Sequence, residues 1–282
     1  MIKPLTQEEF IKLKNLIATT CGISLDDDKK YLIETRLTAI GNDLQAKTFT
    51  DLHNMILADK KKLLPMIIDT MTTNETFWFR DENTWVLLKD VIIPEYILLL
   101  KQTKRPIRIW SAAASTGQEA YSLSMLIKEC TEKANCPELF NSFSIIGTDI
   151  SNEALHIAKN AVYNQISIRR GLSDERLKRF FKQENLKYIL AGEIKKIVEF
   201  KYFNLLDSFK PLGIFDLILC RNIAIYFSQD FKTELFKKIA DCLNIKGTLI
   251  LGATETLYGQ SKDFEAIPDK KCFYYRLQKG EK

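Results

Sequence analysis

Residues 107–121 combine small side chains and one glycine at the junction between an expected strand and an expected helix. Ile107–Ser111 is an apolar run typical of a buried strand, and an amphipathic helical pattern begins at Gln118. Between them lies Ala113–Gly117, where the backbone is barely covered by side chains. Because the N–H groups at a helix N-terminus are free to bind a ligand, this turn predicts a ligand site.

Four polar residues are expected to lie close to this turn in the folded chain. Glu119 lies in the first turn of the expected helix, and Asp149 ends the second expected strand. Arg221 and Asn222 follow a third strand. In an open α/β sheet the carboxyl ends of the strands meet at one crevice, where an acidic residue can accept hydrogen bonds from both hydroxyls of a ribose. We therefore expect these side chains to surround one nucleotide-type cofactor.

The composition of the turn narrows the choice of cofactor. Ala, Ser and Thr occupy the places where the Gly-x-Gly-x-x-Gly pattern of dinucleotide enzymes needs glycine. No lysine follows Gly117, which excludes a Walker-type phosphate loop. A cofactor without phosphates, such as S-adenosylmethionine, fits better. On these residues alone a plain structural strand–helix turn remains the alternative.

The elements around the turn predict an α/β fold with a Rossmann-like, mainly parallel sheet. From residue 106 onward strands and helices alternate. The expected strands are Ile107–Ser111, Ser144–Asp149, Phe215–Cys220 and Thr248–Gly252, and the expected helices are Gln118–Thr131, Asn152–Ala161 and Gln229–Leu243. Two further segments, Phe264–Ile267 and Cys272–Leu277, predict an antiparallel hairpin at the sheet edge.

Three regions follow from the same patterns. Residues 1–72 predict a small all-helical domain, whose first helix starts with a Thr6–Glu9 capping box. Residues 73–105 predict a linker and bridging helix, kinked or broken at Pro94. Residues 106–282 predict the α/β domain, with a small β insertion at about 164–200. Within the insertion, strands 186–190 and 193–198 are expected to pair through a turn at residues 191–192.

Composition excludes several classes of protein. No apolar run among the 282 residues reaches membrane-spanning length, and the first residues lack the pattern of a signal peptide. The six cysteines are scattered without a Cys-x-x-Cys pair, so we expect free thiols, a cytoplasmic location and no metal site. The two histidines, His53 and His156, lie far from the turn in sequence, so a histidine general base is not expected.

The net charge of +5 is unevenly distributed. Residues 1–100 contain 12 Lys and Arg against 15 Asp and Glu, whereas residues 151–210 contain 12 against 7. An excess of this size does not imply nucleic acid. The chain also lacks an Asn/Asp-Pro-Pro-aromatic signature and any interleaving of aromatic and basic residues. We therefore expect no nucleic-acid partner.

Three motifs strongly resemble the chemotaxis receptor methyltransferases, the CheR family. They are Thr-Asn-Glu-Thr-Phe-Trp-Phe-Arg (73–80), Ser-Ala-Ala-Ala-Ser-Thr-Gly-Gln-Glu-Ala-Tyr-Ser (111–122) and Phe-Asp-Leu-Ile-Leu-Cys-Arg-Asn-Ile-Ala-Ile-Tyr-Phe (215–227). Their order and spacing and the helical N-terminal region match as well, so the resemblance covers nearly the whole chain.

The resemblance implies a function and a site. The family transfers a methyl group from S-adenosylmethionine to glutamate side chains on the cytoplasmic helices of chemoreceptors, forming γ-methyl esters. Its cofactor contacts fall on Asn74, Thr76, Arg80, Glu119, Asp149, Asn204, Leu205, Arg221 and Asn222. Arg80 and Tyr226 resemble the residues nearest the methyl group, Arg80 orienting the carboxylate and Tyr226 enclosing the methyl. A glutamate with a pKa of about 4.3 is already an anion at neutral pH, so this chemistry needs no general base.

Two features depart from the family pattern. Members often carry several arginines on the second N-terminal helix that are thought to contact acidic receptors, but here only Arg36 keeps its place. Some members bind a receptor C-terminal pentapeptide through a glycine-rich β insertion. Here Gly192 is the only glycine of residues 182–196, so we expect weak or absent tethering. The basic excess of residues 151–210 is an alternative contact for acidic receptor helices.

Two other functions remain open at this level. One is a cofactor-binding regulatory or scaffold protein without turnover, because binding residues survive more easily than catalytic geometry. The other is a nucleic-acid methyltransferase, given the fold and the positive charge. For the favoured function we expect a monomer that acts on a chemoreceptor and does not insert into a membrane.

Overall fold

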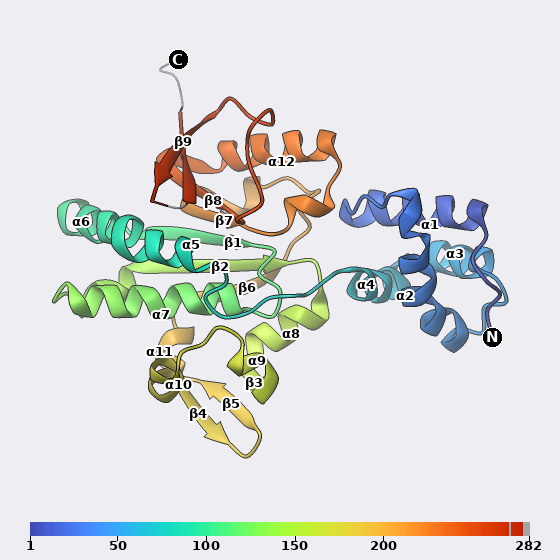
Figure 1. The fold of residues 1–282 in the computed structure, drawn as a ribbon, viewed down its shortest axis with the longest axis horizontal. Coiled ribbons are helices and arrows are strands. Elements are labelled where there is room, and N and C mark those ends of the chain that lie inside the picture. The colour runs from blue at the N-terminus through green and yellow to red at the C-terminus, as the bar shows by residue number, and fades with distance from the viewer. Residues whose placement is uncertain (271, 279–282) are drawn as a thin grey trace.

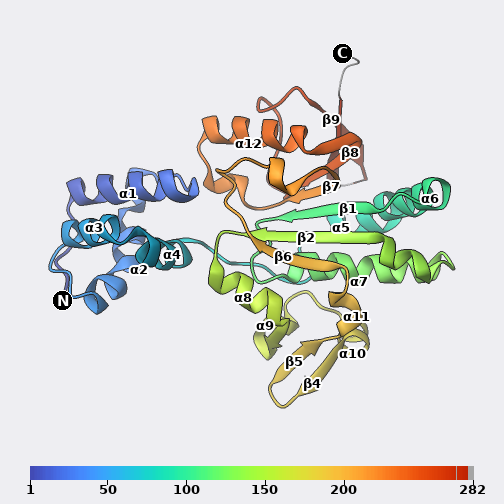
Figure 2. The same cartoon turned by 180° about the vertical axis from the view of Figure 1, so that it is seen from behind.

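The computed structural model describes residues 1–270 and 272–278 and folds them into two lobes. Figures 1 and 2 show a lobe of short helices beside a larger lobe built on a sheet, with an extended segment joining them. Each helix within the described residues is too short or too polar to cross a bilayer.

The N-terminal lobe consists of four α-helices around its own core. The helices are α1 (Gln7–Cys21), α2 (Lys30–Asp43), α3 (Phe49–Ala58) and α4 (Lys60–Met71). The expected capping box at Thr6 and Glu9 is present, and Thr48 forms a second one with Asp51 at the start of α3. These caps satisfy backbone N–H groups that the first helical turn leaves free. Phe10, along with other apolar side chains, is fully buried between the helices.

The larger lobe contains a seven-stranded sheet in the order β6-β2-β1-β7-β8-β10-β9. Its strands are β1 (Ile107–Ala112), β2 (Phe143–Asp149), β6 (Val198–Tyr202), β7 (Phe215–Cys220), β8 (Leu243–Leu251), β9 (Phe264–Asp269) and β10 (Cys272–Leu277). The first five run parallel, and the β9–β10 hairpin adds antiparallel strands at the edge, as expected. Between β1 and β7 the strand order reverses, which is where open α/β sheets bind ligands.

Helices cover both faces of this sheet, and each face has a separate apolar core. One face carries α5 (Glu82–Leu87), α6 (Ile93–Thr103), α7 (Gln118–Lys133) and α8 (Asn152–Asn160), while α12 (Gln229–Asp241) lies on the other. Alternation along β1 places Ile109 in the first core and Trp110 in the second. This two-sided burial explains why β1 and β7 are almost continuously apolar.

The β insertion differs from the expected hairpin. A small antiparallel sheet in the order β3-β5-β4 is formed by β3 (Val162–Asn164), β4 (Phe181–Glu184) and β5 (Lys187–Leu190), with α9 (Gln165–Arg169) and α10 (Asp174–Phe180) between its first two strands. The strand partner of β5 is therefore residues 181–184, and the predicted pairing with 193–198 is wrong. Residues 192–195 form the short helix α11 (Gly192–Lys195), and β6 joins the main sheet beside β2. The alternation of strands and helices along the sequence did not predict β6, which is the third parallel strand in chain order.

Pro94 does not break the bridging helix. The segment Leu88–Ile92 is a π-helical turn between α5 and α6, and Pro94 lies in the first turn of α6. A wider π turn removes the hydrogen bond that proline cannot donate, so the helix continues through it.

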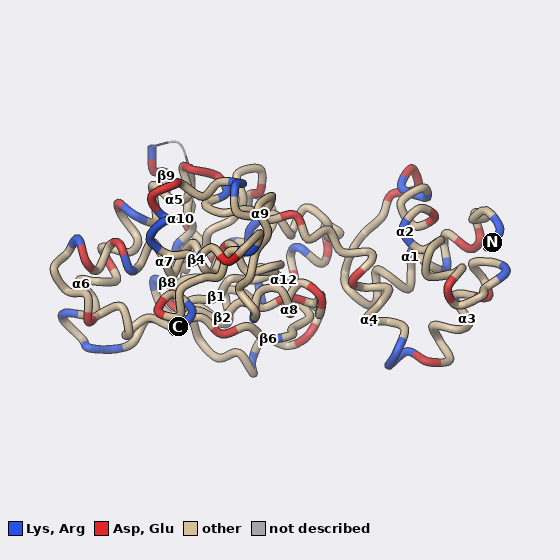
Figure 3. The backbone as a smooth tube through the Cα atoms, turned by 90° about the horizontal axis from the view of Figure 1, so that it is seen from below, with Lys and Arg blue, Asp and Glu red and all other residues tan. Residues whose placement is uncertain are grey.

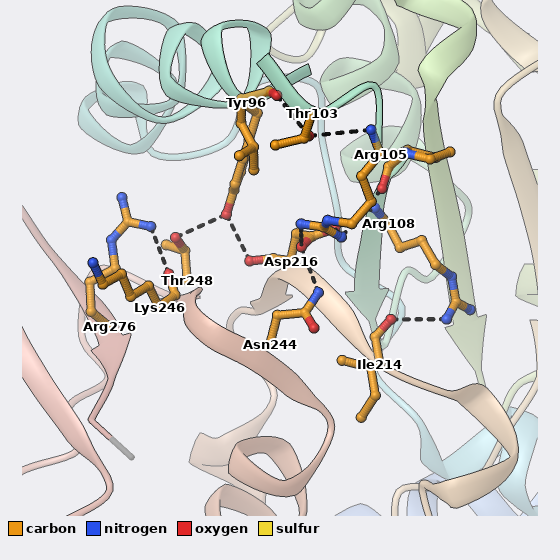
Figure 4. A network of polar contacts seen from close by, with 12 residues as sticks. Tyr96, Thr103, Arg105, Arg108, Ile214, Asp216, Asn244, Lys246, Thr248 and Arg276 are labelled. Carbon is orange, nitrogen blue, oxygen red and sulfur yellow. Dashed lines mark hydrogen bonds and ion pairs between the residues drawn. The ribbon is translucent and has the colours of Figure 1, made fainter. Parts of the chain in front are cut away.

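Asp216 holds the bridging helix against the amino ends of the strands (Figure 4). Asp216 is 3% exposed, and its carboxylate accepts hydrogen bonds from the Arg105 guanidinium at 2.7 and 3.2 Å, from the Arg108 backbone at 2.9 Å and from Asn244 at 2.7 Å. The Tyr96 hydroxyl donates to the Asp216 carbonyl at 2.7 Å. A buried carboxylate with this many donors is compensated for its lost hydration. The network lies at the end of the sheet opposite the switch-point crevice.

The basic excess of residues 151–210 is partly compensated in the folded chain. Figure 3 shows acidic and basic residues interspersed over both lobes. Three of the arginines pair with acidic residues from elsewhere in the chain: Arg170 with Glu75, Arg176 with Glu129, and Arg179 with Glu132. The local charge is therefore lower than the composition of this segment indicates.

Candidate functional site

One pocket at the carboxyl ends of the strands, between the two lobes, brings together all ten expected site residues. Its lining includes Asn74, Thr76, Arg80, Glu119, Asp149, Asn204, Leu205, Arg221, Asn222 and Tyr226. These residues come from the linker, from α7, and from the ends of β2, β6 and β7. The N-terminal lobe contributes Cys21 and Arg36 to the same lining.

The turn after β1 is held in an unusual backbone conformation. Ala113 and Ser115 have φ of 57° and 50°, in the left-handed region that favours glycine. Gly117 has φ of 92°, and a Cβ there would lie 3.0 Å from the Cβ of Ala158. The Ser115 N–H donates to the Asp149 carboxylate at 2.7 Å, which helps to offset the strain. The small residues of this turn therefore leave its backbone accessible, as expected, and hydrogen bonding holds that backbone in one conformation.

Asp149 is buried with both carboxylate oxygens facing backbone donors. Oδ2 accepts from Ser115 N at 2.7 Å and Oδ1 accepts from Ser151 N at 2.9 Å. Burial raises the pKa of this carboxyl, although the backbone hydrogen bonds oppose that shift. Asp149 does not cap the following helix α8, because Ser151 accepts from Ala154 N and is the N-cap residue of that helix. Each Asp149 oxygen retains a lone pair for a ligand hydroxyl.

Arg221 is the buried centre of an ionic cluster. Its guanidinium donates to Glu119 at 2.7 Å, to Asp81 at 2.9 Å and to the Arg80 carbonyl at 2.6 Å. Glu119 also accepts from the Ser111 hydroxyl at 2.7 Å. Among the described residues, the Arg221 Nε is a buried side-chain donor without a partner. A buried donor without a partner is rare in folded proteins, and an anionic ligand group is one way to satisfy it.

Asp81 was missed by sequence reasoning. It is the N-cap residue of α5 with φ of 64°, and its carboxylate is the second counter-ion of Arg221. The only sequence signal for Asp81 is that it directly follows Arg80, the last residue of the 73–80 motif.

The linker is fastened to the site from both sides. The Asn74 carbonyl accepts from the Ser115 hydroxyl at 3.1 Å, and its amide lies 3.4 Å from the Ser151 hydroxyl. From α2, Arg36 donates to the Met71 carbonyl at 2.7 Å and to the Thr73 hydroxyl at 3.1 Å. Arg36 therefore binds the segment that leads into Asn74, a contact that the family pattern did not predict.

The end of α1 contacts two more site residues. The Asn204 amide donates to the Thr20 carbonyl at 2.7 Å, and Ser24 N donates to the Tyr226 carbonyl at 2.8 Å. An antiparallel bridge between Ile23 and Phe227 accompanies the second contact. The helical lobe is thus part of the pocket wall.

Glu255 is a second residue that sequence reasoning missed. Its carboxylate accepts from the backbone N–H groups of Asn222 at 2.6 Å, Ile223 at 3.1 Å and Gly252 at 2.8 Å. It joins the ends of β7 and β8 and fixes Asn222, whose φ of 57° is in the left-handed region. A Cβ at Gly252 would lie 2.9 Å from the Asn222 backbone nitrogen, so a larger residue there would have to shift this turn.

The pocket does not offer an evident general base or nucleophile. None of its described lining residues is a histidine, and Glu119 and Asp149 already accept strong hydrogen bonds. The third lining carboxylate, Glu75, is paired with Arg170 at 2.8 Å. Burial raises the pKa of the Cys21 thiol to about 11, which keeps it protonated at neutral pH. The arrangement can hold a cofactor and align an acceptor that is already ionised.

The sheet order and the site define the class: an α/β domain that holds a nucleoside-containing cofactor at the β1–β7 switch point. Two family models match the chain. The model described as "CheR methyltransferase, SAM binding domain" covers residues 74–273, and "CheR methyltransferase, all-alpha domain" covers residues 8–72. The chain therefore belongs to the CheR methyltransferase family, and its cofactor is S-adenosylmethionine.

Curated relatives match over almost their whole length. A "Chemotaxis protein methyltransferase" of Vibrio parahaemolyticus is 37% identical, covering 97% of this chain and 98% of the relative. "Chemotaxis protein methyltransferase 1" of Pseudomonas aeruginosa is 38% identical, covering 96% and 98%. A relative with the first of these names in Borreliella burgdorferi is 32% identical, covering 93% of both chains.

Proposed function

We propose that this methyltransferase transfers the methyl group of S-adenosylmethionine to glutamate side chains on the cytoplasmic helices of chemoreceptors, forming γ-methyl esters. The observation that carries the proposal is a cofactor pocket with arginines at its wall and with the Glu119 and Asp149 carboxylates already engaged. Such a pocket suits an anionic acceptor, which needs alignment rather than deprotonation. The names of the curated relatives support a chemotaxis role.

The pocket residues fit this cofactor. S-adenosylmethionine supplies a methyl group on a sulfonium when it is bound. Asp149 accepts from the ribose hydroxyls, and the free Nε of Arg221 donates to the methionine carboxylate. We assign Glu119 to the amino group of the methionine part, which its negative charge would attract. The remaining contacts are assigned to Asn74, Thr76, Arg80, Asn204, Leu205 and Asn222.

Arg80 and Tyr226 act on the acceptor side of the reaction. Arg80 orients the acceptor carboxylate, because its planar guanidinium can donate two parallel hydrogen bonds. With the cofactor held by the residues named above, its sulfonium would supply the methyl group to a carboxylate oxygen and would become a neutral thioether. No proton is released, and opposite charges disappear. Tyr226 and the apolar wall exclude the water that would stabilise those charges.

The partner is the cytoplasmic region of a chemoreceptor, and we expect the enzyme itself to be a cytoplasmic monomer. Pentapeptide tethering is expected to be weak or absent, since Gly192 is the only glycine in residues 182–196 and lies in α11. Calorimetric titration with a receptor C-terminal pentapeptide tests this. Micromolar binding would contradict it.

Methyl-labelled S-adenosylmethionine and a receptor cytoplasmic fragment test the proposed reaction. We expect label that is released as methanol in base, and an Arg80→Ala variant with strongly reduced turnover. Base-stable label would indicate an amine or nucleic-acid acceptor. Cofactor binding without any label would favour a regulatory protein.

A further inference from the structure

Two arginines share one aromatic ring at the edge of the pocket. The guanidinium carbons of Arg80 and Arg170 lie 5.4 and 5.3 Å from the centre of the Phe77 ring. Arg80 comes from the linker, whereas Arg170 directly follows α9 in the β insertion. Glu75 joins the cluster, since its carboxylate lies 2.8 Å from Arg170 and its carbonyl accepts from Arg80 at 3.2 Å. Glu75, Phe77 and Arg80 all line the pocket.

The backbone holds Arg170 in this place. Trp78 N donates to the Arg170 carbonyl at 3.0 Å, which ties the insertion to the linker. Gly171 has φ of 87°, and a Cβ there would lie 1.9 Å from the Trp78 carbonyl oxygen. Only glycine allows so close an approach. The position of Arg170 beside Glu75 is therefore built into the main chain.

The Glu75–Arg170 ion pair is easy to exchange. The two side chains are 58% and 49% exposed, and ion pairs this exposed contribute little to stability. A carboxylate from another molecule can replace Glu75 at little cost in free energy, because Arg170 would exchange one carboxylate partner for another. Phe77 would continue to support the guanidinium from one side.

We propose that Arg170 binds a carboxylate of the acceptor protein next to the glutamate that Arg80 orients, and that Glu75 is its internal competitor. The inference rests on the proposed function, which supplies an acidic helical acceptor. A helix presents carboxylates three or four residues apart on one face, so two neighbouring arginines can bind two of them. Arg170 would thus help to determine which glutamates are methylated.

Three variants test the assignment: Arg170→Ala, Glu75→Gln and, as a matched control, Arg169→Ala, which removes an exposed cation next to Arg170. Initial rates of base-labile methyl transfer to a receptor fragment give kcat and KM, and calorimetry gives S-adenosylmethionine affinity. We expect Arg170→Ala to raise the KM for the fragment about three- to tenfold and Glu75→Gln to lower it about two- to threefold. Arg169→Ala should leave it unchanged, and cofactor affinity should hold in all three.

A merely structural ion pair would give a different pattern. Arg170→Ala and Glu75→Gln would then both weaken cofactor binding or both raise KM, and the inference would be wrong. It would also be wrong if Arg170→Ala matched Arg169→Ala. Failure of the wild-type enzyme to form any base-labile product would instead overturn the proposed function.

Discussion

The Arg221 guanidinium lies 2.7 Å from the Glu119 carboxylate, and only 1% of the Arg221 side chain is exposed. The Asp81 carboxylate, which directly follows the 73–80 motif, is a second counter-ion and lies 2.9 Å from the same guanidinium. Two carboxylates around one arginine leave the cluster with one net negative charge. That charge favours a cationic ligand group beside Glu119, while the free Nε favours an anionic one. Both are present in the amino-acid end of S-adenosylmethionine.

Neutralising Glu119 tests this cluster. Glu119→Gln leaves Arg221 with one carboxylate, so we expect a loss of about 1–3 kcal/mol in unfolding free energy by urea titration. Cofactor affinity measured by calorimetry should fall as well. Glu82→Gln, an exposed acid in the first turn of α5, should change neither quantity. Equal behaviour of the two variants would contradict the role of Glu119.

Asp149 predicts a pH dependence of cofactor binding. Burial raises its pKa above the ordinary value of 3.8, so the carboxyl takes up a proton at higher pH than a solvated aspartate. A raised pKa also means that ionising this carboxyl lowers the free energy of unfolding as pH rises through that window. S-adenosylmethionine affinity should therefore weaken on acidification, beginning above pH 3.8.

Asp149→Asn is the corresponding variant. It removes one acceptor oxygen, so affinity at neutral pH should fall about tenfold or more, and this acid-dependent step should disappear. Calorimetry across pH on both proteins checks the prediction. A variant with wild-type affinity would remove Asp149 from the ribose site.

Arg36 should affect the cofactor rather than the receptor. Arg36→Gln weakens its contacts with Met71 and Thr73, so the linker ahead of Asn74 loosens and the S-adenosylmethionine Kd should rise about three- to tenfold. Lys30→Gln removes a cation from the same helix and serves as the control. If Arg36 mainly contacts acidic receptors, KM for the receptor fragment will rise while cofactor affinity stays constant.

Glu255 is expected to act by positioning Asn222 and Ile223. Glu255→Gln keeps one acceptor oxygen and Glu255→Ala keeps none, so turnover and cofactor affinity should fall in that order. Each lost bond weakens the loop by about 1 kcal/mol. Initial rates and calorimetry on both variants measure this graded effect, with Glu265→Gln on the exposed edge strand as control. Equal losses in both Glu255 variants would show that charge alone matters.

Sequence patterns predicted the α/β fold, the helical lobe and the parallel strands because periodicity and caps are local signals. Glu119, Asp149, Arg221 and Asn222 meet in one pocket because the strand ends of a parallel sheet converge. The other six site residues were expected from the family resemblance, and they line the same pocket. The strand pairing in the insertion was wrong because residues 181–184 continue directly from α10 without a turn signal. The π turn before Pro94 was likewise hidden.

The contacts that hold the site could not be read from spacing. Glu255 lies 33 residues after Asn222, and Asp81 lies 140 residues before Arg221. Their roles depend on how β7 and β8 end and on how the linker crosses the pocket. Long-range partners of this kind require the three-dimensional fold, since neither residue forms part of a periodic pattern.

Mass spectrometry of a receptor cytoplasmic fragment incubated with the enzyme and S-adenosylmethionine tests the central claim most directly. We predict peptides that carry one additional methyl group on a glutamate side chain, and complete loss of that group after treatment with base. The same fragment incubated with Arg80→Ala should remain largely unmodified. A base-stable methyl group, or one on a residue other than glutamate, would contradict the account.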